Sequence, residues 1–311
     1  MAIFYSVGVR AASFPDRPIK VIIGFAAGGP LDQHMRLLTD RLQKELGQPI
    51  IVDYRAGAGG TIGADAVAKS SPDGYTLMLA NTGVLSINGA LYKKLPFDLK
   101  KDFVPVARTA LQPLALMVNN NVPAKTLREF LSYAKSHPKD INFGSGGNGG
   151  ISHLVPEMLN TVGGLSMRHI PYKGSAPAFN DLISGQVQFM AESVPQAATF
   201  AKQGLLRALA VTSRERNTAL PDVPTTNEAG LPNFEVVGFY GIMAPAATPR
   251  DVVEKLSKAF GAVLKQPDLR ERMVSQGADP AYLNSEDFRR FLFAETPRWE
   301  RAVREAGASI D

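Results

Sequence analysis

Two glycine-rich segments constrain the fold of this chain more than any other feature. The first covers residues 24–32 (GFAAGGPLD) and the second covers residues 144–153 (GSGGNGGISH). Each follows a short apolar run typical of a buried strand and precedes a helical pattern. A strand that turns through glycine into a helix leaves backbone amides unpaired, and the helix dipole there favours negative charge. Two such turns facing each other across a cleft would hold a small anion.

The first hundred residues predict an alternating α/β unit. Strands are expected at 19–25, 49–54 and 75–80, with helices at 32–46 and 61–70 between them. This order is typical of a parallel sheet with right-handed crossovers. Because 311 residues are many for one hydrophobic core, we expect two domains.

A second α/β series follows, and the chain ends in helices. Thr126 and Glu129 form a capping box for a helix that Pro138 closes. The remaining expected elements are strands at 141–143, 167–171, 187–191 and 206–211, and helices at 152–162, 176–184, 249–265, 268–276 and 285–306.

Two long extended segments, residues 106–118 and 234–243, predict two crossings between the domains. They divide the chain into a discontinuous domain 1, residues 14–108 plus 234–311, and an inserted domain 2, residues 109–233. Ligands of open α/β sheets bind beyond the carboxyl ends of the strands. In two lobes joined by hinges, those ends can face one cleft.

Composition excludes several function classes. The net charge is +5, and lysines and arginines are interleaved with acids, so we expect no nucleic-acid partner. The absence of cysteine excludes disulfides, thiolate nucleophiles and cysteine-ligated metals. No apolar stretch reaches the roughly 18 residues that span a bilayer.

Residues 1–13 are apolar and end in Ala11-Ala12-Ser13, like the end of a signal peptide. The basic region that opens such peptides is missing, and the apolar part is short. We interpret this segment as a leader remnant or a disordered extension and leave it out of the fold.

Short motifs run in order from about residue 14 to the end of the chain. They are FPDRPIK at 14–20, FAAGG at 25–29, GAGG at 57–60, PDGYTL at 72–77, YKKLPFD at 92–98, DFVPV at 102–106, GS at 144–145, PYKG at 171–174, DLISGQV at 181–187, LPDVPT at 220–225 and EAG at 228–230. In this order they resemble the solute-binding proteins of tripartite tricarboxylate transporters, the Bug (TctC-like) family.

The resemblance implies an α/β, two-lobed periplasmic-binding-protein (Venus flytrap) fold with two hinge-crossing strands. It also implies a monomeric periplasmic protein, without cofactor, that is not an enzyme. Such a protein captures a small carboxylate and delivers it to membrane transporter subunits; the ligand would be a di- or tricarboxylate, an amino acid or an aromatic acid. Because the usual leader is not intact here, periplasmic export is inferred from the family.

The predicted ligand-binding residues lie at the strand ends and in the two glycine-rich loops. Carried over by position, the carboxylate would meet backbone amides of the first loop from one lobe and of the second loop from the other. The full set is Phe25, Ala27, Gly28, Gly29, Pro30, Asn81, Thr82, Gly83, Ser145, Gly147, Gly149, Ser152, His153, Tyr172, Lys173, Gly174, Ser175, Ala176, Glu192 and Ser193.

Each residue type also has a structural interpretation. The glycines can serve tight turns, Asn81 and Ser175 can cap helices, and an exposed lysine such as Lys173 is usually only solvated. Asp32, in the first helical turn, is expected to hold the first loop. His153 and Glu157 lack the HExxH pattern, so no metal is expected, and His153 would contact ligand or cap its own loop.

Two alternatives remain. Gly144, Gly146 and Gly149 fit GxGxxG after a strand, which is the pattern of a nucleotide-dependent enzyme, but no acidic residue follows the next strand. The Walker and GxSxG patterns are also absent. A cytoplasmic sensor with flytrap lobes would need a DNA-binding segment, and residues 1–13 are too short for one.

Overall fold

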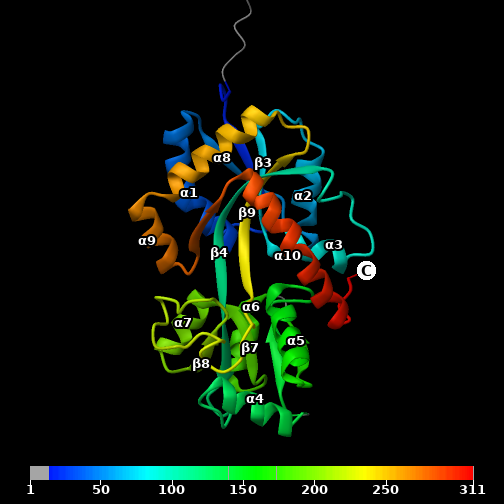
Figure 1. The fold of residues 1–311 in the computed structure, drawn as a ribbon, viewed down its shortest axis with the longest axis vertical. Coiled ribbons are helices and arrows are strands. Elements are labelled where there is room, and N and C mark those ends of the chain that lie inside the picture. The colour runs from blue at the N-terminus through cyan, green and yellow to red at the C-terminus, as the bar shows by residue number, and fades with distance from the viewer. Residues whose placement is uncertain (1–13, 139, 173, 311) are drawn as a thin grey trace, which may run out of the picture.

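The computed structural model describes residues 14–138, 140–172 and 174–310, so the predictions for residues 1–13 and for Lys173 lie outside the described residues. The chain folds into two α/β lobes, drawn one above the other in Figure 1. Two long strands run between them, as the sequence predicts.

The first lobe holds the N-terminal α/β unit and the C-terminal helices. Its elements are β1 Ile19–Ile23, α1 Pro30–Leu46, β2 Ile50–Tyr54, α2 Thr61–Ala68, β3 Thr76–Asn81, α3 Asn88–Leu91, α8 Arg250–Leu264, α9 Pro267–Ser275, β10 Asp279–Leu283 and α10 Ser285–Glu305. Strands β2, β1 and β3 pair in parallel, as predicted.

The second lobe is the inserted α/β series. Its elements are α4 Leu127–Ser136, β5 Asn142–Ser145, α5 Ile151–Gly163, β6 Arg168–Pro171, α6 Ser175–Ser184, β7 Phe189–Ser193, α7 Val194–Lys202 and β8 Leu206–Val211. Strand β5 pairs in parallel with β6 and β7. Helix α7 and strand β10 were not expected from the sequence.

Strands β4 (Phe103–Asn119) and β9 (Val237–Pro245) join the lobes. They pair antiparallel from Phe103↔Pro245 to Pro113↔Val237, and β9 also pairs with β3. Beyond Pro113, β4 changes partners and pairs with β7 and β8. The predicted domain boundary at 108/109 falls inside β4, and the boundary at 233/234 falls shortly before β9.

Local signals explain several of the element ends. Helix α1 stops at Gly47, which has a φ of 70°, as its sequence predicts. Thr126 caps α4 by accepting a hydrogen bond from the Glu129 amide at 3.2 Å, and Glu129 accepts one from the Lys125 amide at 2.6 Å. The predicted cap at the start of α4 is therefore confirmed.

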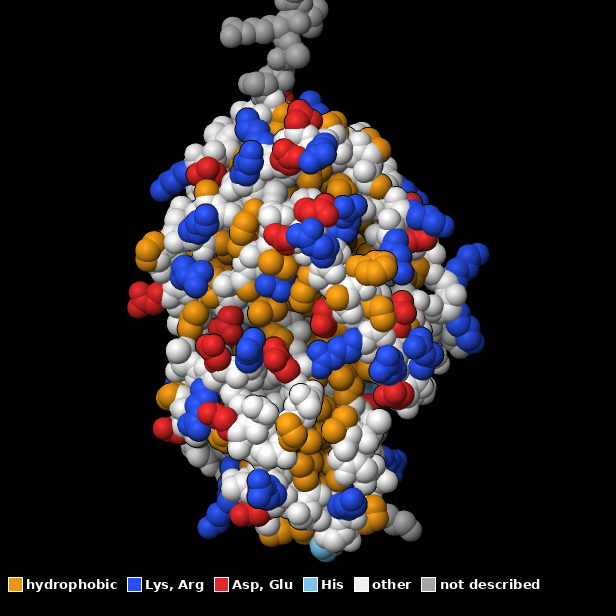
Figure 2. Space-filling view, viewed as in Figure 1, with side chains coloured by type: hydrophobic (Ala, Val, Ile, Leu, Met, Phe, Trp, Pro, Cys, Tyr) orange, Lys and Arg blue, Asp and Glu red, His pale blue; other side chains and the backbone are white. Residues whose placement is uncertain are grey.

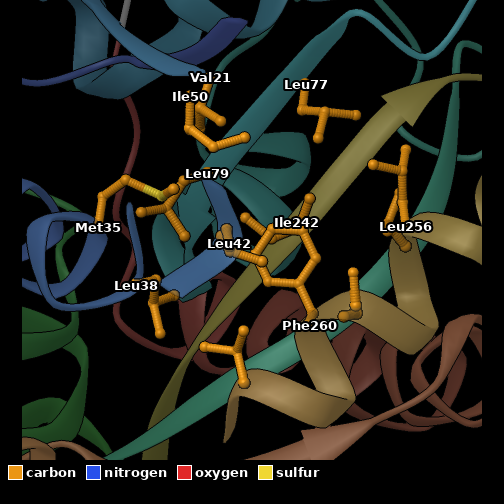
Figure 3. Packing of buried hydrophobic residues seen from close by; sticks show 14 of the residues in the cluster. Val21, Met35, Leu38, Leu42, Ile50, Leu77, Leu79, Ile242, Leu256 and Phe260 are labelled. Carbon is orange, nitrogen blue, oxygen red and sulfur yellow. The ribbon is translucent and has the colours of Figure 1, made fainter. Parts of the chain in front are cut away.

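The core of the first lobe lies between its sheet and helices α1 and α8. Figure 3 shows Leu38 and Leu42 of α1 and Phe260 of α8 facing Leu79 and Ile242 of the sheet. All five side chains are buried. Burial of each contributes about 1.5–3 kcal/mol, which fixes the sheet and hence the loops at its carboxyl edge.

Helix α10 contacts both lobes. Its N-terminal part packs on the first lobe, where Phe288 is buried beside Phe239. Its C-terminal part descends beside α5 in Figure 1, and Trp299 and Val303 share a core cluster with Leu154 of α5. The predicted domain 1 includes all of α10, and this contact ties its end to domain 2 as well.

The surface shows no concentration of one charge on the face drawn in Figure 2, where basic and acidic side chains are interspersed. Among the described residues, no helix is both long and apolar enough to cross a membrane.

Candidate ligand-binding site

A cavity of about 500 Å³ lies between the lobes, beside the crossing strands. The loop after β1 and the end of β3 border it from the first lobe. The starts of α5, α6 and α7 border it from the second lobe. Its lining residues are Phe25, Ala26, Ala27, Gly29, Pro30, Leu31, Asn81, Gln112, Pro113, Leu114, Ile151, Ser175, Ala176, Glu192, Ser193, Gln196 and Tyr240.

Four helices begin at this cavity. They are α1 at Pro30, α5 at Ile151, α6 at Ser175 and α7 at Val194. The first amides of a helix have no partner inside that helix and carry a partial positive charge. The cavity therefore favours a negatively charged group, although no lysine or arginine lines it among the described residues.

The first glycine-rich loop leaves amides available to the cavity. No hydrogen bond between described residues uses the amides of Ala26, Ala27 or Leu31, and all three residues line the cavity. Gly28 differs: its amide donates to Asp32 Oδ2 at 2.7 Å, and Gly28 does not line the cavity. Pro30 lines the cavity but has no amide hydrogen to donate.

Asp32 holds the first loop in place, which confirms its predicted structural role. Its buried carboxylate accepts hydrogen bonds from the Gly28 amide, from Arg36 Nε at 2.8 Å and from the Tyr54 hydroxyl at 2.5 Å. Burial alone would raise the pKa of Asp32, but these hydrogen bonds and the Arg36 charge outweigh it and lower the pKa. Asp32 is thus an ionised anchor behind the loop.

Three amides of the second glycine-rich loop are bonded within the loop itself. The Gly146 amide donates to Ser152 Oγ at 3.1 Å, and the Gly147 amide donates to Ser145 Oγ at 3.2 Å. The Gly149 amide donates to His153 Nδ1 at 3.0 Å. The predicted residues Ser145, Gly147, Gly149, Ser152 and His153 do not line the cavity.

Two stacked histidines support this second loop. The rings of His153 and His169 lie 3.8 Å apart, and His169 Nε2 lies 2.6 Å from Ser145 Oγ. Burial, together with the nearby His153, lowers the pKa of His169 to about 4, although Glu157 opposes the shift. His169 is therefore neutral near pH 7 and can share a hydrogen bond with the serine.

Among the described residues that line the cavity, only Glu192 carries a carboxyl group. Its Oε1 accepts from Ser175 Oγ at 2.5 Å, and its Oε2 accepts from the Ser193 amide at 2.9 Å. Burial raises the pKa of Glu192, while hydrogen bonds from Ser175, the Ser193 amide and Ser152 oppose the rise.

The other predicted residues divide into two groups. Phe25, Asn81 and Ala176 line the cavity, whereas Gly83 and Gly174 do not. Two more predicted side chains are used elsewhere in the fold. Thr82 Oγ1 accepts from the Phe239 amide at 2.7 Å, and the Tyr172 hydroxyl donates to Asp181 at 2.6 Å, a contact that with burial raises the pKa of Tyr172 to about 12.

Several lining residues were not predicted. Gln112, Pro113, Leu114 and Tyr240 come from the crossing strands, whose register brings them to the cavity. Gln196 comes from α7, the helix that the sequence analysis does not contain. Its Ser193-Val194-Pro195 start, with proline near the first helical position, is the signal that could have revealed it.

Comparison with known proteins identifies the family. Residues 34–308 match the family described as "Tripartite tricarboxylate transporter family receptor". Protein BugT of Bordetella pertussis is 37% identical over 303 residues, which cover 97% of this chain and 93% of that protein. The chain belongs to the tripartite tricarboxylate transporter receptor family.

Solved structures of this family share the fold. Rpa4515 of R. palustris, solved with adipate, superposes with a TM-score of 0.85 at 32% identity and covers 95% of this chain and 99% of its own. MatC from Rhodopseudomonas palustris, solved with bound malate, has a TM-score of 0.79 at 36% identity. The match covers 93% of this chain and 100% of that protein's chain. The periplasmic binding protein BugD has a TM-score of 0.80 at 35% identity, covering 95% and 99%.

These matches confirm the predicted family and two-lobed fold. The receptors of this family are extracytoplasmic solute-binding proteins, and this chain is a solute-binding protein of that family rather than an enzyme. The nucleotide-enzyme alternative is not supported, and the amides of Gly146 and Gly149 are bonded within their own loop.

Proposed function

We propose that the cavity binds a small carboxylate and that the protein delivers it to the membrane subunits of a tripartite transporter. The observation that carries this proposal is the set of unbonded amides of Ala26, Ala27 and Leu31 at the cavity wall. Charge-assisted hydrogen bonds from such amides to a carboxylate contribute about 1.5–3 kcal/mol each. The adipate and malate found in two family structures are of this ligand class.

In this proposal some of the predicted residues contact the ligand directly and others position the residues that do. Phe25, Ala27, Gly29, Asn81 and Ser175 would contact the ligand. The second loop would act indirectly, because it positions the starts of α5 and α6. The protein would work as a periplasmic monomer whose lobes close on the ligand by bending at Gln112–Leu114. A ligand shifts that equilibrium only through contacts made better in the closed state.

The test is titration calorimetry with a panel of mono-, di- and tricarboxylates, aminocarboxylates and aromatic acids. Gly29→Leu is measured beside the wild type. Gly29 has a φ of −77°, so leucine fits the backbone, but its side chain would fill the space before the free amides. We expect binding to weaken more than 100-fold while the unfolding free energy changes by no more than about 1 kcal/mol.

Gly89→Leu is the matched control. Gly89 is exposed, lies outside this cavity and has no atom within 4 Å of an added Cβ, so binding should be unchanged. Failure of every carboxylate to bind the wild type would contradict the proposal. So would undiminished binding by the Gly29→Leu variant.

A further inference from the structure

The two lobes line the cavity with chemically different groups. From the first lobe, the loop before α1 offers unbonded amides, which suit an anion. From the second lobe, the end of β7 contributes the carboxyl group of Glu192. Among the described lining residues no lysine or arginine balances it. A ligand with carboxylates at both ends would place one of them beside Glu192.

Two neighbours donate hydrogen bonds to Glu192. Ser175 Oγ and the Ser193 amide donate to its two oxygens. The Ser152 hydroxyl also acts to lower the pKa of Glu192, and because Ser152 Oγ accepts from the Gly146 amide, its hydroxyl hydrogen remains free. An ionised carboxylate accepts only, so this arrangement fits the ionised form.

We propose that Glu192 determines specificity by selecting ligands that carry an ammonium group as well as a carboxylate. The carboxylate would meet the amides of Ala26 and Ala27, and the ammonium would meet Glu192. The inference rests on the proposed function and names the ligand class within it. Burial raises the pKa of Glu192, and a ligand cation beside it would oppose that rise by favouring the ionised carboxylate.

The experiment compares ligand pairs that differ only by an amine in place of a carboxylate. The pairs are 3-aminopropanoate with succinate, 4-aminobutanoate with glutarate, and 5-aminopentanoate with adipate, together with alanine and methylmalonate. Calorimetry at pH 7.5 gives the dissociation constants. For the pair whose length fits the cavity, we expect the wild type to bind the aminocarboxylate at least tenfold tighter than the diacid.

Glu192→Gln keeps the shape of the side chain and removes its charge. We expect it to bind the aminocarboxylate at least tenfold more weakly and the matched diacid more tightly, which reverses the preference. Glu215→Gln is the control, because Glu215 lies in the same lobe, is exposed and does not line the cavity. That variant should keep the wild-type preference.

Lys173→Met is measured as well, because Lys173 is close in sequence to the lining residue Ser175. An unchanged aminocarboxylate preference in this variant supports the inference. Tighter diacid binding by the wild type, or a Glu192→Gln preference equal to the wild type, would overturn the inference and leave carboxylate binding standing. Binding of neither class would overturn the proposed function, and the inference with it.

Discussion

The two glycine-rich loops look alike in sequence but differ in what their amides do. In the first loop, Asp32 takes one amide, that of Gly28, and the amides of Ala26 and Ala27 stay available to the cavity. In the second loop, three glycine amides donate hydrogen bonds to the side chains of Ser145, Ser152 and His153. The same strand-turn-helix pattern therefore leaves amides free at the cavity in one lobe and bonds three of them within the loop in the other.

The difference lies in the number of acceptor side chains. Asp32 bonds only the Gly28 amide, four residues before it, and its other oxygen is held by Arg36 and Tyr54. His153 likewise bonds the amide four residues before it, but Ser145 and Ser152 bond two further amides of the second loop. A glycine-rich turn binds an anion only if no nearby side chain has already bonded its amides.

The largest effect on stability is expected from Asp32→Ala. Removing the carboxylate leaves Tyr54, Arg36 and the Gly28 amide without their acceptor, which should lower the unfolding free energy by about 1.5–3 kcal/mol. Carboxylate binding should weaken more than tenfold because the free amides lose their position. Urea unfolding and calorimetry measure the two effects. Wild-type affinity in this variant would show that the first loop does not depend on its anchor.

A fall in pH should lower the unfolding free energy of the protein through His169, which contacts the second loop. His169 has a folded pKa of about 4 against 6.5 for the free side chain, so the unfolded chain binds more protons between these values. Stability should therefore fall as pH drops from about 6.5 to 4, by at most about 1.4 kcal/mol per pH unit for this group. Buried His34 in the first lobe, also with a pKa of about 4, adds a slope of the same sign.

Variants separate these contributions in urea unfolding across that pH range. His169→Phe keeps an aromatic ring against Phe143 and should reduce the slope, as should replacement of His34. The slopes are compared with that of His137→Asn, which replaces an exposed histidine of the second lobe. An unaltered slope in the His169 variant would show that this ring does not couple stability to pH.

The smallest effect is expected from Ser145→Ala. The substitution removes the hydroxyl that bonds the Gly147 amide and His169, and should cost about 1 kcal/mol of stability. Because Ser145 does not line the cavity, affinity for a carboxylate should stay within about threefold of wild type. A much larger loss of affinity would mean that the second loop contacts the ligand directly, and the comparison of the two loops would fail.

Most of the fold could be predicted from the sequence because its signals are local. The apolar strand runs, Gly47 at the end of α1 and the Thr126 cap of α4 each act within a few residues. Strand β10 was missed because its pairing with β4 joins segments far apart in the chain. Helix α7 was missed although Pro195 marks its start.

The lining of the cavity was predicted only where it follows from local signals. Residues at strand ends, such as Phe25, Asn81 and Glu192, line the cavity where the α/β topology predicts them. Gln112 and Tyr240 belong to long crossing strands, and only the register of β4 with β9 shows which of their residues face the cavity. The pattern of neighbouring residues contains no such information.

The sequence by itself determined the family, the order of strands and helices, and the places where glycine turns meet helix starts. The tertiary structure decided which turn keeps its amides free. The bonds to the amides join residues only two to six positions apart, but the acceptor side chains are themselves held by contacts such as Tyr54 with Asp32 and His169 with Ser145, which join residues separated by 22 and 24 positions. Such contacts form only when packing brings the strands together, so no local pattern could reveal them.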